Sequence, residues 1–326
     1  MTETVLTFGL ALLIILLAQF GERNRRAQWL DYLILLLAAL ALLAAGILIL
    51  FTPEMLQPLG SDARGKKFAW IIIGAALLII LPLILAINAT RRRQNPTLRG
   101  IPWTRPVHLT AWTLLTLFIG GNFAVAQLKD LSDLEIDHAL PLLIIQNTGF
   151  ALAALLGVGW GVRRSWRDVL ARLGLRRPTL GDALIGTGMA LMMLICTGIM
   201  GVLVMLIFGE DMTASSGFNQ QIISQLHGAG GVLLMGLATG AGEEMLYRGA
   251  LQPVAGVWLT SFLFAVSHIQ YLSPAIIVIF VLGLMLGYTR NKWGLGAAIW
   301  THALYNALVG LLTLAAMNLD QFNVGM

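Results

Sequence analysis

The stretch GLATGAGEEMLYRGALQPVAGVW, residues 236–258, places two adjacent glutamates at the end of a long apolar run. Residues 229–242 carry no charged side chain; Glu243 and Glu244 follow them directly, and Arg248 comes about one helical turn later. A charged side chain at the centre of a membrane helix costs about 2.5–3.5 kcal/mol on insertion. A chain that keeps two of them there is predicted to contain a reactive polar pocket at the membrane.

The composition places the whole chain in the membrane class. Of its 326 residues, 58% are hydrophobic and 11% are charged, whereas soluble domains carry about 25% charged residues. Several apolar runs are long enough to cross a bilayer. We therefore predict an all-α fold, a polytopic membrane helix bundle with about ten transmembrane helices and the active site between the later ones. The expected helices are residues 4–20, 29–51, 69–88, 108–126, 139–161, 183–208, 229–249, 255–271, 273–289 and 294–316.

The distribution of basic residues predicts the topology. With ten spans, one set of alternate loops holds 17 of the 21 Lys and Arg residues, Arg248 among them, and the other set holds 4. Cytoplasmic loops are enriched in these residues, so we expect a multi-pass cell-membrane protein with both termini outside the cytoplasm. The net charge of +5 is explained by this topology, and no nucleic-acid partner is expected.

Two further features were interpreted from the sequence. In the basic loop 162–182, the apolar spacing fits a short amphipathic helix on the membrane surface, but a solvated connector fits equally well. The residues that give this spacing are Trp166, Val169, Leu170 and Leu173. The glycine-rich stretches 228–242 and 283–296 predict close helix packing.

Helical spacing separates the roles of the two glutamates. Glu244 and Arg248 are four residues apart, which places them on one helix face within reach of an ion pair. Glu243 points elsewhere, because neighbouring helical residues differ by about 100° in direction. We therefore expect Glu244 to support the structure with Arg248, and Glu243 to face the histidines and act as a base.

Two more helical pairs supply the other groups that hydrolysis needs. Phe264 and His268 are four residues apart, and so are His302 and Asn306. His268 is the expected partner of Glu243 around a water molecule. His302 is either oriented by Asn306 or presents an N–H group together with it to one substrate oxygen. A base and preorganised donors are the components that add water to a carbonyl group.

This set of residues resembles the CPBP family of intramembrane proteases, which includes CAAX prenyl proteases and bacteriocin-processing (Abi) enzymes. The family pattern EExxxR, FxxxH and HxxxN occurs in order at 243–248, 264–268 and 302–306. The resemblance covers about residues 173–310. We expect residues 108–316 to form the protease core, 1–107 to be N-terminal transmembrane helices of unknown role, and 317–326 to be a tail.

The resemblance implies a glutamate-type mechanism. It assigns water activation to Glu243 and His268 and an oxyanion hole to His302 and Asn306, with Glu244, Arg248 and Phe264 in supporting positions. It also implies that no cofactor is needed. A zinc ion held by Glu243, His268 and His302 is the alternative, although the sequence lacks the HExxH pattern of helical zinc sites.

Two other functions also fit these residues. Membrane carboxylates and histidines also build the proton relays of transporters, and a non-catalytic bacteriocin-immunity or scaffold protein is a further alternative. For the protease, the expected partners are a peptide or a protein C-terminal tail as substrate and the lipid bilayer. The sequence does not specify whether that substrate is prenylated.

Overall fold

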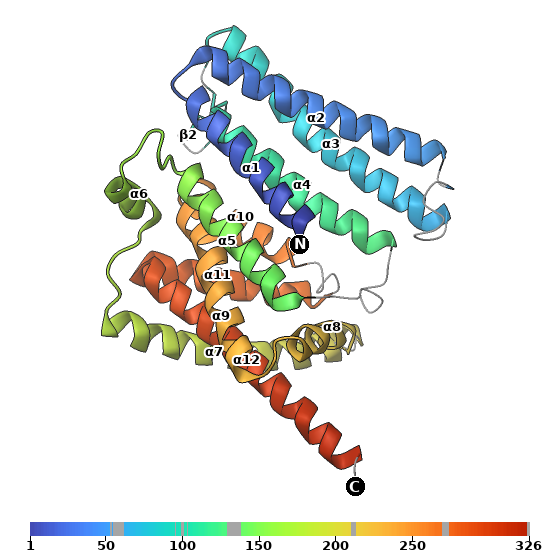
Figure 1. Ribbon diagram of the computed structural model, residues 1–326, viewed down its shortest axis with the longest axis vertical. Helices are drawn as coiled ribbons and strands as arrows, with labels where there is room; N and C mark the ends of the chain where they lie inside the picture. The colour runs from blue at the N-terminus through green and yellow to red at the C-terminus, as the bar shows by residue number, and fades with distance from the viewer. Residues whose placement is uncertain are drawn as a thin grey trace. The chain divides into compact units, whose positions relative to one another are not determined.

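The computed structural model describes residues 1–52, 54, 62–94, 96–98, 101–102, 104–128, 138–209, 213–268 and 274–324. Nearly all of the described chain is helical (Figure 1). Nine described helices or continuous helical runs are long and apolar enough to cross a membrane. The chain is therefore a polytopic helical membrane bundle, as its composition predicts.

The elements are α1 (Thr2–Gly21), α2 (Arg25–Phe51), α3 (Asp62–Arg91), β1 (Thr97–Leu98), β2 (Ile101–Pro102), α4 (Pro106–Leu128), α5 (Ala139–Gly157), α6 (Trp166–Leu173), α7 (Leu180–Phe208), α8 (Thr213–Ser224), α9 (Ala229–Glu244), the π-helix η3 (Met245–Leu251), α10 (Gln252–Val266), α11 (Ile276–Trp293) and α12 (Leu295–Val324). The two short strands pair in antiparallel fashion.

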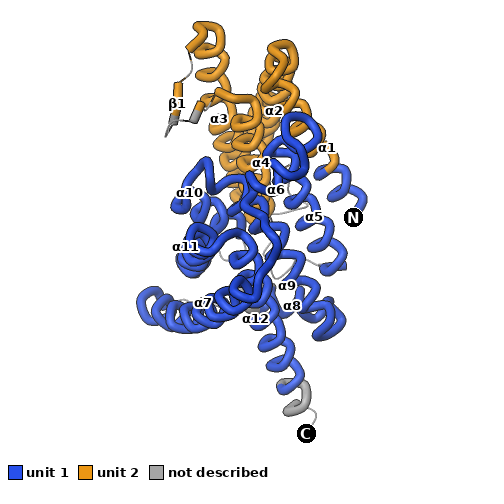
Figure 2. The backbone as a smooth tube through the Cα atoms, turned by 90° about the vertical axis from the view of Figure 1, so that its left-hand side faces the viewer, with its two compact units in different colours: residues 1–8, 135–326 blue, residues 9–134 orange. Residues whose placement is uncertain are grey.

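The chain divides into two compact units (Figure 2). Residues 9–134 form the N-terminal unit, and residues 1–8 with 135–326 form the motif unit, named for the three motifs it contains. The structural division lies at 134/135 because α4 packs against α2 and α3. The division by role expected from the sequence, at 107/108, stays a prediction.

Polar contacts connect α2 with the start of α4 in the N-terminal unit. The Tyr32 hydroxyl donates to the backbone carbonyl of Thr104, and the Thr110 hydroxyl donates to the buried Asp31 carboxylate at 3.2 Å. Because buried polar groups need partners, these contacts fix how the two helices pack within this unit.

Residues 229–266 form two helical arms, and the chain reverses direction between them at Gly256. This glycine has a φ of 80° and a ψ of 166°, a conformation that side chains other than glycine rarely adopt. Before the break, Gln252 Nε2 donates to the carbonyl of Gly287 on α11 at 3.0 Å. After the break, Val257 packs against the same Gly287. Ser261 then packs against Gly283, one turn earlier in α11, so the chain folds back along α11.

This reversal refines the two helices expected at 229–249 and 255–271. Both exist, but the returning arm 257–266 is only about 15 Å long at 1.5 Å per residue, about half of the hydrocarbon thickness. The end of the second expected helix, from residue 269, lies outside the described residues. The assignment of Arg248 to a loop is wrong, because it is fully buried inside η3 and cannot report topology.

Glycines bring α9 into backbone contact with α12. A Cβ atom on Gly236 would lie 2.6 Å from the carbonyl oxygen of Ala303, and one on Gly240 would lie 2.7 Å from the nitrogen of the same residue. Only helices without side chains at the crossing can approach this closely. The close packing predicted for the glycine-rich stretch 228–242 is confirmed.

The short helix expected in the basic loop is α6, which begins with a capping box between Ser165 and Asp168. Its apolar residues Val169 and Leu173 are buried in a core cluster with Leu295. Val169 and Leu173 of the predicted apolar face therefore pack against the protein itself, whereas Trp166 of that face stays exposed.

The close contact of α9 with α12 predicts a marked difference between two glycine substitutions. Gly240→Ala places a Cβ atom against the Ala303 backbone, which cannot move alone, so we expect destabilisation of about 1–3 kcal/mol. Gly188→Ala in α7 is the matched control, since nothing lies within 4 Å of its Cβ position. It should be neutral or stabilising by up to about 1 kcal/mol. Thermal unfolding in detergent measures both, and equal melting temperatures would contradict the packing.

Candidate active site

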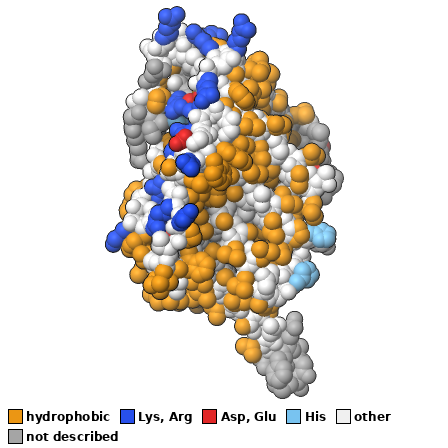
Figure 3. Space-filling view, turned by 60° about the vertical axis from the view of Figure 1, so that its left-hand side comes forward, with side chains coloured by type: hydrophobic (Ala, Val, Ile, Leu, Met, Phe, Trp, Pro, Cys, Tyr) orange, Lys and Arg blue, Asp and Glu red, His pale blue; other side chains and the backbone are white. Residues whose placement is uncertain are grey.

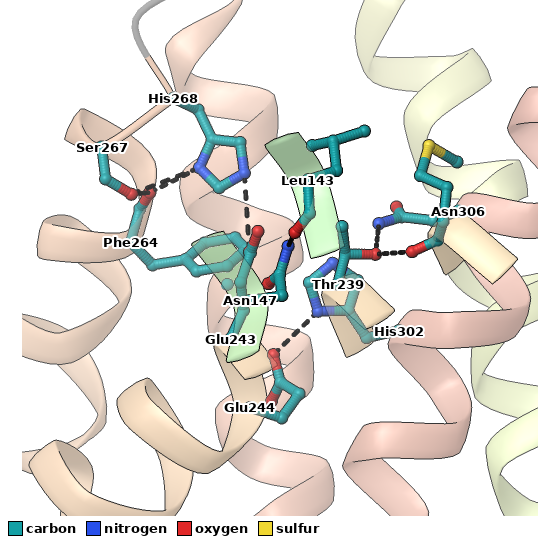
Figure 4. A network of polar contacts seen from close by, with 12 residues as sticks. Leu143, Asn147, Thr239, Glu243, Glu244, Phe264, Ser267, His268, His302 and Asn306 are labelled. Carbon is teal, nitrogen blue, oxygen red and sulfur yellow. Dashed lines mark hydrogen bonds and ion pairs between the residues drawn. The ribbon is translucent and has the colours of Figure 1, made fainter. Parts of the chain in front are cut away.

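The three motifs meet in one polar cluster of the motif unit (Figure 4). Glu243 and Glu244 are the last two residues of α9, and His268 follows the end of α10 closely. His302 and Asn306 lie one turn apart on α12. The exposed fractions are 8% for Glu243, 0% for Glu244 and 4% for His302. The fold thus brings together all four residues predicted to be catalytic.

Glu243 and His268 each direct one hydrogen-bond acceptor atom toward the other residue. Nδ1 of His268 lies 2.8 Å from the carbonyl oxygen of Phe264, and because a carbonyl only accepts, Nδ1 carries the proton. In the neutral ring, Nε2 then has a lone pair, and it lies 3.8 Å from Glu243 Oε2. That carboxylate oxygen is buried and accepts no hydrogen bond from the described protein atoms. This pair is well arranged to receive a molecule that donates to both atoms.

Glu244 connects two helices through its carboxylate. Its Oε2 lies 3.6 Å from Arg248 Nε, with both side chains fully buried, which confirms the ion pair predicted from the spacing. Its Oε1 accepts from His302 Nδ1 at 3.0 Å. The expectation that Glu243 faces both histidines is therefore wrong in part: His268 pairs with Glu243, whereas His302 hydrogen-bonds Glu244.

Phe264 and η3 hold the Arg248 guanidinium in place. The guanidinium lies 4.6 Å from the centroid of the Phe264 ring, a distance typical of a cation–π contact, and it donates to the carbonyl of Gly283 at 3.1 Å. The Phe264 ring also packs against His268 and His302, with centroid distances of 4.6 and 5.8 Å. Phe264 therefore forms a wall shared by both histidines.

Thr239 orients Asn306, a contact that sequence reasoning missed. The Thr239 hydroxyl donates to the carbonyl of Met235 at 2.9 Å, so its oxygen can only accept from Asn306 Nδ2, which lies 2.9 Å away. This contact fixes which way the Asn306 amide points. His302 and Asn306 are thus oriented by separate partners, Glu244 and Thr239. Thr239 precedes Glu243 by four residues, and that spacing was a signal of a shared helix face.

Asn147 of α5 is a second residue that the sequence did not reveal. Its Nδ2 donates to the carbonyl of Leu143 at 2.9 Å, which leaves Oδ1 on the other side of the amide. That oxygen is buried and has no hydrogen-bond partner among the described residues. Asn147 packs directly against Gly242, and Figure 4 shows its amide beside Glu243. It therefore adds a further acceptor to the cluster.

The zinc alternative requires three ligands to converge. Among the described residues, no group of three or more His, Cys, Asp or Glu side chains is arranged to hold a metal ion. Glu243, His268 and His302 are close neighbours within the cluster, but they do not form such a group.

Comparisons with known proteins identify the segment that contains these motifs. Residues 225–308 match the model of the Rce1-like family, described as type II CAAX prenyl endopeptidase Rce1-like. This segment is an Rce1-like domain and belongs to the CPBP family, so the predicted family is confirmed. Asn147 lies outside the matched residues.

A relative in Bacillus subtilis (strain 168), the uncharacterized protein YpbD, is 34% identical over 90 residues. The match covers 26% of this chain and 47% of that protein, so the chain spans about half the length of this relative. No solved structure matches the chain.

The two glutamates should respond differently to the same substitution. Glu244→Gln leaves the fully buried Arg248 without its counter-charge, and we expect a loss of about 3–5 kcal/mol in folding stability. Glu243→Gln removes a carboxylate without a close hydrogen-bond partner and should change stability by less than about 1 kcal/mol. Thermal unfolding and the yield of folded protein in detergent measure both. Similar losses in the two variants would refute the division of roles.

Proposed function

We propose that this protein is an intramembrane endopeptidase that hydrolyses a peptide bond with a water molecule activated by Glu243 and His268. The single observation that carries the proposal is the pair of acceptors, Glu243 Oε2 and His268 Nε2, which face each other at 3.8 Å. A water molecule about 2.8 Å from each atom donates one hydrogen to each. Its lone pairs then point toward the substrate. The Rce1-like domain supports a peptide substrate.

The proposed reaction balances without a metal ion. The water oxygen attacks the peptide carbonyl carbon while a proton passes to the Glu243 carboxylate. The resulting tetrahedral intermediate carries a negative charge on the former carbonyl oxygen. The carbon–nitrogen bond then breaks, and the proton held by Glu243 moves to the leaving nitrogen. The products are a carboxylic acid and an amine, and Glu243 returns to its carboxylate form.

His302 and Asn306 are the proposed donors to the oxyanion. Asn306 uses one Nδ2 hydrogen on Thr239, which leaves the second for the substrate. His302 directs Nδ1 to Glu244, so its Nε2 donates only when the ring carries both protons. The Glu244 carboxylate, which also pairs with Arg248, accepts from Nδ1 and favours the doubly protonated ring, as the buried aspartate does in serine-protease triads.

Asn147 is proposed to bind a backbone N–H group of the peptide. Its Oδ1 is a buried acceptor beside a carboxylate, and neighbouring acceptors are best satisfied by donors that the substrate brings. A peptide in extended form offers one N–H group per residue. This contact would position the substrate without taking part in proton transfer.

The substrate is proposed to be the tail of a membrane protein or a small bacteriocin-like peptide that reaches the site at the bilayer. We further propose that the chain lies in the cell membrane with both termini outside the cytoplasm. With Arg248 excluded, the loops still divide 16 to 4 in basic residues. The reversal at Gly256 preserves the alternation on which this count depends.

Two other classes make different experimental predictions. A proton-coupled transporter would show vesicle uptake that depends on Glu243. An immunity or scaffold protein would keep its phenotype without the acceptor pair. Within the described part of the chain, no specific contact favours either class over hydrolysis.

Loss of the base should abolish cleavage without loss of protein. In cells that produce Glu243→Gln or His268→Ala, we expect at least one membrane peptide precursor to accumulate relative to wild type, as measured by proteomics. For a purified substrate, kcat should fall by a factor of about 10² to 10⁴. Unchanged peptides at equal protein level would refute the proposal. Chelators should leave activity intact, and activity that is lost on chelation and restored by zinc would overturn the metal-free mechanism.

Removal of the Asn147 acceptor should weaken substrate binding more than chemistry. For Asn147→Leu we expect KM to rise by about three- to tenfold, which corresponds to the binding free energy of one hydrogen bond. We expect kcat to change less. Gln146→Leu, at the neighbouring position of α5, is the matched control and should leave KM unchanged. A fall confined to kcat would refute the binding role of Asn147.

A further inference from the structure

Three half-buried arginines that take no part in the candidate active site gather at one end of the motif unit. Arg164 precedes α6, Arg172 lies in the last turn of α6, and Arg290 lies in the last turn of α11. Burial and the neighbouring charges of Arg164 and Arg290 lower the pKa of the Arg172 guanidinium. The Arg290 guanidinium lies 3.9 Å from the Cβ position of Gly174, directly after α6. We call these three residues the arginine cluster.

The partners of the arginine cluster are neutral. Arg164 donates to the carbonyl of Val158, and Arg290 donates to the Asn291 side chain at 3.3 Å. Arg172 donates to the carbonyls of Gly249 and Ala250 at 3.2 and 3.5 Å. These bonds hold the guanidinium groups in place, but they leave the positive charge of the cluster without compensation.

The acidic residues closest in the chain are already engaged elsewhere. Asp168 caps the first turn of α6 through Ser165. Asp182 caps α7 through Thr179 and pairs with Arg176 at 2.5 Å. Across the described ranges of the chain, no Asp or Glu forms an ion pair with a member of the cluster. Three like charges that are partly shielded from water repel one another, and an anion would relieve this repulsion.

The surroundings of the cluster indicate the level of the lipid headgroups. Trp160 and Trp166 are exposed beside it, with ring centroids 5.5 Å apart, and tryptophan is enriched at membrane interfaces. The apolar helices α5 and α11 end at Gly157 and Trp293, next to the cluster. On the face in Figure 3, Lys and Arg side chains form groups, while apolar side chains cover much of the rest.

We propose that the arginine cluster binds the phosphate group of an anionic membrane lipid. Guanidinium groups bind phosphate oxygens through paired, charge-assisted hydrogen bonds. A lipid at this level presents its phosphate to the cluster while its chains remain in the bilayer. Because Arg172 also holds the carbonyls at the end of η3, the bound phosphate lies close to the segment that carries Arg248 and stabilises it.

The test uses the purified full-length protein in a neutral detergent. A short-chain phosphatidylglycerol is titrated against a phosphatidylcholine with the same chains, and the melting temperature and native mass spectra report binding. We expect phosphatidylglycerol to bind in preference and to raise the melting temperature. Arg290→Gln should weaken this binding about fivefold, the contribution of one basic residue at a membrane surface, and Arg290→Lys should retain most of it.

Arg177→Gln is the matched control, because Arg177 is an exposed arginine of the same loop region and lies outside the cluster. Its binding should stay within twofold of wild type. Circular dichroism and the melting temperature without lipid check that each variant folds. Equal weakening in both glutamine variants, or no preference over phosphatidylcholine, would overturn the proposal. If glycerol phosphate without chains stabilises the protein equally well, the ligand is a soluble phosphate ester and the lipid assignment fails.

Discussion

The structure of the candidate site depends on the buried carboxylate of Glu244. This group receives a hydrogen bond from His302 on α12 and balances the charge of Arg248 on η3. A buried charge without a partner is strongly destabilising, so α9, η3 and α12 must keep the spacing that these contacts require. The glycine contacts between α9 and α12 supply that spacing, because they bring the two backbones together beside the carboxylate. Packing and electrostatics therefore specify the same arrangement.

The second constraint is the reversal at Gly256. Glu243 and His268 are separated by 25 positions in the chain, which would place them about 37 Å apart along a straight helix. Their side chains are instead 3.8 Å apart, because the returning arm after Gly256 runs back along α11. The acceptor pair thus comes from one folded-back stretch, whereas the proposed oxyanion donors come from α12. The break at Gly256 thus allows both sets to meet in one cluster.

Much of the site followed from spacing alone. The four-residue intervals from Glu244 to Arg248 and from Phe264 to His268 predicted contacts that the structure contains, since residues four apart share a helix face. The composition predicted the membrane bundle, and the three ordered motifs predicted the family. These inferences succeeded because helical periodicity and hydrophobicity are local properties. The expectation for His302 failed in part, because its partner depends on how α12 rotates against α9.

The sequence by itself determined the class of fold, the positions of most helices and the identity of the polar residues that cannot be left in lipid without partners. The tertiary structure decided which partners they have. In the folded chain, His302 hydrogen-bonds Glu244, and Asn306 hydrogen-bonds Thr239. Asn147, from a helix distant in the sequence, packs beside Glu243 at Gly242, and Arg248 is buried where a loop had been expected. The physical reason is that contacts between helices depend on crossing points and backbone breaks, such as the glycine contacts at Ala303 and the reversal at Gly256. Local spacing does not encode these features.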